Sequence, residues 1–138
     1  MGLKRTKIDR ITSVLICEAA DKTCEFCGSQ DGTHQCMHDI SRTYVITRYD
    51  PRNLACGCGR CHYYMTKDSH LHHENFVKLK GAEEVQLNRE RAHSGERLKD
   101  FEKEEIYQHY KKELKRIQEK RKSGHIGKIE IEVPEILL

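Results

Sequence analysis

Two cysteine pairs decide the fold of this chain: Cys24-Glu-Phe-Cys27 and Cys58-Gly-Arg-Cys61. A two-residue spacer lets both thiolates of a pair approach one ion from a tight turn, and two such turns complete a tetrahedral site. This ligand set is typical of structural Zn²⁺. Cys56 lies beside the second pair, so either Cys56 or Cys58 can be the ligand, and the two-residue spacer favours Cys58.

The composition also favours a small domain held together by a metal. Charged residues make up 34% of the 138 residues and aromatic residues only 7%, with no Trp. Such a chain has too little bulky apolar material for a large core, and small domains with thin cores usually need a disulfide or a metal. Seven cysteines are an odd number, which would leave one thiol outside a full set of disulfides.

The same cysteines bear on the compartment. We see no signal peptide and no transmembrane run, so we expect a cytoplasmic protein with no membrane partner. In a reducing compartment paired cysteines are more often metal ligands than disulfides. The remaining thiols, Cys17 and Cys36, are expected to pack in the core.

The segments around the cysteine pairs predict an α+β protein. Its expected parts are an N-terminal helix (1–22), a zinc-bound core (23–80), a polar connection (81–95), a long charged helix (96–122) and a C-terminal tail (123–138). Inside the core we expect strands over 34–38 and 53–56 and a helix from about Arg60. Alternating β-favouring residues over 42–49 and 128–133 allow further extended segments.

Three polar residues lie at chemically informative places in this core. His38 ends the first expected strand, Asn53 begins the second, and His62 directly follows Cys61. A neutral imidazole can take a proton from water near pH 7, and the activated water can attack a phosphodiester. A divalent ion held near the helix start would stabilise the developing charge. Asn53 has both a donor and an acceptor, so it can tie the loop to the strand and fix the His38 ring.

In this order and spacing the chain resembles the HNH, or ββα-metal, nucleases. The family segment N-L-x-x-x-C-x-x-C-H matches Asn53-Leu-Ala-Cys-Gly-Cys58-Gly-Arg-Cys61-His62. A closer likeness is to the phage NinG (Rap) recombination endonucleases, which share an H-x-I-x-R segment and a T-R-[FY]-D segment. These are represented by His38-Asp-Ile-Ser-Arg42 and Thr47-Arg-Tyr-Asp50, and the likeness covers about residues 20–80.

The resemblance implies a zinc-stabilised ββα-metal core and a metal-dependent endonuclease. The substrate would be duplex or branched DNA, such as a Holliday junction or another recombination intermediate. His38 would be the general base, Asn53 the structural asparagine, and His62 a ligand of the catalytic Mg²⁺ or Mn²⁺. A phage-encoded member would act in the host cytoplasm. Symmetrical cuts would suit a homodimer, and the apolar stripe of the helix over 96–122 would be available for it.

The chain departs from the family at the residue before the base. Many HNH enzymes have an ion-binding Asp there, and this chain has Met37. Candidates to complete the ion's ligands are Asp39, His34, His70 and His73. His72 and its neighbours are otherwise expected to be solvated on a surface helix.

Arginines beside the proposed site are expected to contact DNA phosphates, because the guanidinium fork donates two parallel hydrogen bonds. These residues are Arg42, Arg48 and Arg60, whereas Arg52 fits a solvated surface.

Two other classes of protein remain open. One is a non-catalytic zinc module that binds DNA or a recombination protein, and the other, weaker one is a redox or metal-storage protein.

Overall fold

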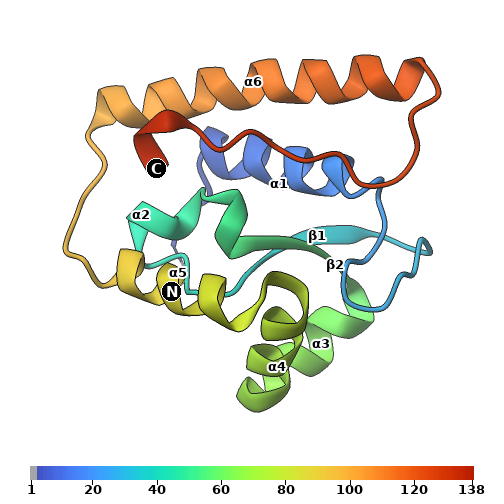
Figure 1. The fold of residues 1–138 in the computed structure, drawn as a ribbon, viewed down its shortest axis with the longest axis horizontal. Coiled ribbons are helices and arrows are strands. Elements are labelled where there is room, and N and C mark those ends of the chain that lie inside the picture. Colours follow the sequence, from blue (N-terminus) through green and yellow to red (C-terminus); the bar gives the residue numbers. More distant parts are fainter. Residues whose placement is uncertain (1–2) are drawn as a thin grey trace.

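The computed structural model describes residues 3–138 and shows an α+β arrangement, with helices on both sides of a small sheet (Figure 1). The sheet has two strands. In chain order the elements are α1 (Lys7–Ala19), β1 (His34–His38), α2 (Val45–Arg48), η1 (Pro51–Asn53), β2 (Leu54–Cys58), α3 (Gly59–Lys67), α4 (Ser69–Lys80), α5 (Ala82–Ala92), α6 (Asp100–Lys122) and η2 (Glu135–Leu137). Within the described part of the chain, every helix is too short or too polar to cross a bilayer.

The two strands and the helix after them form one continuous unit. β1 pairs antiparallel with β2, from His34 opposite Cys58 to His38 opposite Leu54. β2 then passes directly into α3, and the Cys58 side chain caps the start of that helix. Gly57 lets the Met37 side chain cross β2 closely, because a Cβ there would lie 2.2 Å from the sulfur of Met37 and would force that side chain to move.

Helix α1 lies between α6 and the sheet, as Figure 1 shows. One apolar core fills the space between α1 and α6, and Leu15, Tyr110 and Ile117 in it are completely buried. A second core lies between the sheet and the pair α3 and α4, with Phe76 at its centre. The apolar stripe of α6 that we expected to be available for a partner is therefore used inside the chain.

The C-terminal tail is extended but is not a sheet strand. Its backbone bonds to helix residues instead: Ile129 N donates to Ala19 O at 2.8 Å, and Glu132 N donates to the Glu113 carboxylate at 2.9 Å. Arg116 donates to the carbonyl of Glu130 at 2.8 Å. The strict alternation over 128–133 thus reflects one side packed on α1 and α6, without strand pairing.

Two other segments differ from expectation. Residues 45–48 form the short helix α2 inside the stretch that alternates, and α5 occupies most of the expected polar connection. The sequence of α5 looks polar because few of its residues are buried, and one of these is Asn88. Asn88 donates to the carbonyl of Arg52 at 2.8 Å, a contact that periodicity does not reveal.

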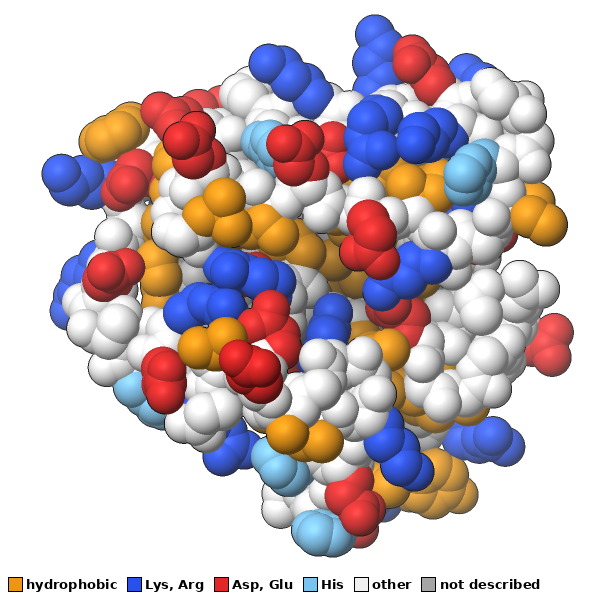
Figure 2. Space-filling view, viewed as in Figure 1, with side chains coloured by type: hydrophobic (Ala, Val, Ile, Leu, Met, Phe, Trp, Pro, Cys, Tyr) orange, Lys and Arg blue, Asp and Glu red, His pale blue; other side chains and the backbone are white. Residues whose placement is uncertain are grey.

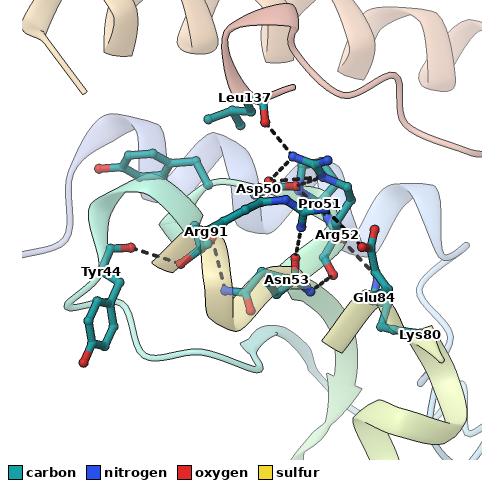
Figure 3. A network of polar contacts seen from close by, with 12 residues as sticks. Tyr44, Asp50, Pro51, Arg52, Asn53, Lys80, Glu84, Arg91 and Leu137 are labelled. Atoms are coloured by element: carbon teal, nitrogen blue, oxygen red, sulfur yellow. Dashed lines mark hydrogen bonds and ion pairs between the residues drawn. The ribbon is translucent and has the colours of Figure 1, made fainter. Parts of the chain in front are cut away.

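Arg52 links this region to the end of the chain (Figure 3). Its guanidinium donates to the buried carboxylate of Asp50 at 2.7 Å and to the carbonyl of Leu137 at 2.6 Å. Lys80 donates to the carbonyl of Pro51 at 3.1 Å. Arg52 is thus a structural tie and not the solvated residue that we expected, and it holds the segment before β2 in place.

Figure 2 shows charges of both signs mixed over the face that carries the tail. Lys and Arg side chains gather over the C-terminal half of α6, which ends with Lys120, Arg121 and Lys122. Positive side chains at a helix C-terminus are favourable, because the helix dipole is negative there.

Candidate metal centre and histidine cavity

The four cysteines predicted as ligands lie together. The sulfur atoms of Cys24, Cys27, Cys58 and Cys61 are all within 4.8 Å of one another, and those of Cys27 and Cys58 are 3.7 Å apart. A tetrahedral zinc site with bonds of about 2.3 Å has sulfur atoms about 3.8 Å apart. The residues present therefore fit a structural metal such as zinc.

Local backbone geometry explains how each pair forms. The carbonyl of Cys24 accepts from Gly28 N at 2.8 Å, which closes the first turn, and Gly28 has a φ of 78° that favours glycine. In the second pair, Cys61 N donates to the Cys58 sulfur at 3.5 Å at the start of α3. This backbone contact lowers the pKa of Cys58 to about 7 and favours the thiolate that a metal binds.

The structure also settles which cysteine of the second pair belongs to the group. Cys56 is completely buried and packs with Ile16 and Leu54, whereas Cys58 joins the metal centre. Successive residues of a strand alternate between its two faces, so Cys56 and Cys58 would share a face if β2 stayed regular. Helix α3 begins at Gly59, and this change of backbone direction turns the Cys58 side chain toward the metal centre instead. Cys17 and Cys36 pack against the cluster that contains Cys56, as expected.

A cavity of about 520 Å³ lies between α1, β1, α3 and α4. Its lining includes both histidines predicted to act together, and the functional side chains in it are Asp9, His38, Arg42, Arg48, His62 and His72. His38 comes from the end of β1, and His62 comes from the first turns of α3, where it is exposed. The ββα order thus brings two imidazoles to one cavity.

The His38 ring is held in one tautomer. Its Nε2 lies 3.0 Å from the carbonyl of Arg48. Because a carbonyl only accepts, Nε2 must carry the proton, and Nδ1 keeps the free lone pair. Burial lowers the pKa of His38 to about 4, against the opposing effect of this hydrogen bond, so the ring is neutral at pH 7. A neutral ring with a free nitrogen can accept a proton from water.

Asn53 makes the contacts that were expected of a structural tie. It is completely buried, its Oδ1 accepts from Ile40 N at 2.8 Å, and its Nδ2 donates to the carbonyls of Ile40 and Thr47 at 3.1 Å each. These bonds join the two ends of the loop after β1. The loop in turn places the Arg48 carbonyl on His38, while a role of Asn53 in activity stays a prediction.

Arg48 differs from the expected phosphate contact. Its side chain is 8% exposed, and its guanidinium donates to both carboxylate oxygens of Asp9, at 2.9 and 2.6 Å. Burial alone would raise the pKa of Asp9, but the hydrogen bonds from Arg48 and Thr6 lower it to about 2. A phosphate could reach Arg48 only by breaking this ion pair, so we assign Arg48 a structural role.

The other two arginines are more available. Arg42 lines the cavity, and its Nη2 lies 3.5 Å from Asp9. Although buried, that nitrogen makes no hydrogen bond to any residue between 3 and 138, so it can still donate to an anion. Arg60 is exposed on α3 beside Cys27 and Cys58, outside the cavity.

The four candidates for completing the ion site are mostly elsewhere. His34 bonds the Ser29 carbonyl at 2.8 Å, His70 is exposed beside Glu74, and His73 contacts Arg89. Asp39 instead contacts His72, which we expected to be solvated.

His72 is the residue that sequence reasoning missed. It lines the cavity, and its ring lies 4.9 Å from that of Phe76, between centroids. Asp68 caps a new helix at Ser69, and this fixes the phase of α4. The spacing from His72 to Phe76 and Leu79 is helical and was the available signal.

Among residues 3–138, the four cysteines are the only group of three or more potential metal ligands that lie this close together. No protein-family model matches the chain, and searches of curated proteins and of solved structures found no match either.

Proposed function

We propose that the protein is a divalent-ion-dependent endonuclease that hydrolyses phosphodiester bonds in duplex or branched DNA. The observation that carries the proposal is the state of His38: a neutral imidazole, hydrogen-bonded through Nε2 to a carbonyl, in a cavity that it shares with His62. The order of elements, with a hairpin followed directly by a helix and a four-cysteine cluster at its base, agrees with the HNH resemblance.

Each cavity residue then has a defined task. Nδ1 of His38 accepts a proton from the attacking water, and Nε2–H stays on the Arg48 carbonyl. Arg42 donates to a non-bridging phosphate oxygen with its free N–H group. A divalent ion held by His62 would stabilise the charge on the phosphate and on the leaving oxygen. The four cysteines hold zinc and keep β2 and α3 in register with the turn at Cys24.

A cleavage assay tests this function. Purified, zinc-loaded protein is offered supercoiled plasmid, linear duplex, a four-way junction and single strands, with Mg²⁺, Mn²⁺, Co²⁺ or Ni²⁺, or with a chelator. We expect cutting of at least one duplex or branched substrate that stops with the chelator and leaves 5′-phosphate ends. Folded protein that cuts none of these substrates with any divalent ion would overturn the proposal.

The second candidate is a zinc module that binds DNA or a recombination protein without cutting. The basic end of α6, far along the chain from the cavity, gives this alternative its support. A binding module would retain DNA affinity when His38 is replaced, and it would show no ion-dependent product in the same assay.

A further inference from the structure

The second imidazole of the cavity wall, that of His72, is held by the backbone of Asp39, whose carboxylate lies close by. The Nε2 atom of His72 lies 3.2 Å from the backbone carbonyl of Asp39 and 3.5 Å from its carboxylate. Both of these groups accept hydrogen bonds, so Nε2 carries the proton and Nδ1 keeps its lone pair. His72 is therefore prepared, like His38, to use Nδ1 on a ligand.

The Asp39 side chain is only 4% exposed, and its Oδ2 makes no hydrogen bond within residues 3–138. A buried carboxylate without full hydrogen bonding is costly, so the unpaired Oδ2 of Asp39 calls for an explanation. A carbonyl or carboxylate that accepts from the second ring nitrogen fixes the ring orientation, which is the common arrangement behind histidine metal ligands. His72 has this arrangement through the backbone carbonyl of Asp39, and the Asp39 carboxylate lies 3.5 Å from the same nitrogen.

Among residues 3–138, none that lines the cavity supplies a carboxylate free to bind an ion. Met37 lies where a carboxylate would precede the base, and it is 4% exposed within the core around Phe76. Asp9 is occupied by Arg48 and lies close to Arg42. Besides His38, which serves as the base, the lining supplies the imidazoles of His62 on α3 and His72 on α4 as strong metal donors. His62 is exposed, so its side chain can turn toward an ion beside His72.

From this geometry we infer that His72, oriented by Asp39, binds the divalent ion together with His62. This inference rests on the proposed function, because it concerns the ion of the same cavity. Imidazole nitrogens favour the later first-row transition metals, whereas Mg²⁺ prefers oxygen ligands. The site is therefore selective for ions such as Ni²⁺ and Co²⁺ over Mg²⁺, with DNA oxygens and water completing the coordination.

Calorimetric titration of the full-length, zinc-loaded protein with Ni²⁺ tests the inference without DNA. We expect His72→Gln to weaken Ni²⁺ binding at least tenfold, and Asp39→Asn to weaken it by a smaller factor, because it removes the nearby negative charge but keeps the backbone carbonyl that orients the ring. The matched control is His70→Gln on the same helix, because that side chain is 81% exposed and should leave binding unchanged. A hundredfold excess of Mg²⁺ should not displace the bound Ni²⁺.

Zinc content and the far-ultraviolet circular dichroism spectrum show whether each variant is folded. If His72→Gln does not fold, Asp39→Asn provides the second test. Wild-type protein that binds no Ni²⁺, or a folded His72→Gln variant that binds it equally well, would overturn the inference. Ion binding that depends on His72 without any DNA cleavage would support the inference and refute the nuclease. DNA cleavage by a protein whose ion binding does not depend on His72 would support the nuclease and refute the inference.

Discussion

Replacement of His38 by Ala is expected to lower the rate of DNA cleavage by about 10²- to 10⁴-fold, the usual contribution of a general base. No other group in the cavity can take its place easily. The Asp9 carboxylate is bound to Arg48, and the free lone pairs of His62 and His72 are assigned to the divalent ion. The fold should survive, because the substitution removes one hydrogen bond, worth about 1 kcal/mol, from a half-buried side chain.

His34 provides the matched control for this experiment. It lies at the opposite end of the same strand, and its ring also bonds a backbone carbonyl, that of Ser29 at 2.8 Å. It is not part of the cavity lining. We expect His34→Ala to cleave DNA at the wild-type rate, measured as initial velocity on the best substrate. Equal losses in both variants would point to a structural effect, and an active His38→Ala protein would remove His38 from the chemistry.

Loss of one metal ligand is expected to have the largest effect on stability. Cys58 caps α3, ends β2 and belongs to the four-cysteine group, so Cys58→Ser acts on three features at once. The apparent binding energy of a structural zinc is about 10–16 kcal/mol, and a domain of this size is stable by only about 5–15 kcal/mol. We expect the variant to lose bound zinc and at least about 5 kcal/mol of unfolding free energy.

Cys17→Ala is the control for the metal centre, because Cys17 is outside the four-cysteine group and packs beside Ile16. It should keep one zinc per chain by elemental analysis, with only a modest fall in the melting temperature. A strong chelator should unfold the wild-type protein in the same way as Cys58→Ser does. A Cys58→Ser protein that holds zinc and melts like the wild type would contradict a role for these sulfurs in the fold.

The sequence predicted the elements that depend on local signals. The spacing of the cysteine pairs, the β1 and β2 segments and the apolar stripe of α1 each have a pattern that is visible within about a dozen residues. The choice of Cys58 over Cys56 also followed from the two-residue spacer. The bounds of the long helix were less accurate, since α6 begins at Asp100 and was expected from residue 96.

Contacts between residues far apart in the sequence could not be predicted from such local patterns. Arg48 looked like a phosphate ligand beside the site, but Asp9, which neutralises it, is 39 residues away. The buried Asn88 of α5 gains its partner from Arg52, so a segment that looked polar is an ordered helix. His72 was assigned to a solvated helix because only His70 and His73 share a face at helical spacing, and its contact with Asp39, 33 residues away, does not show in that spacing.

The protonation state of His38 decides whether the cavity can perform base catalysis, and nitrogen-detected NMR across a pH titration measures it directly. The unfolded chain takes up this proton near pH 6.5, so a folded pKa of about 4 also means that stability falls as the pH decreases between these values. We expect a pKa of about 4 with the proton on Nε2 throughout the neutral range. A pKa at or above 6.5, or a neutral ring protonated on Nδ1, would contradict the proposed role of His38.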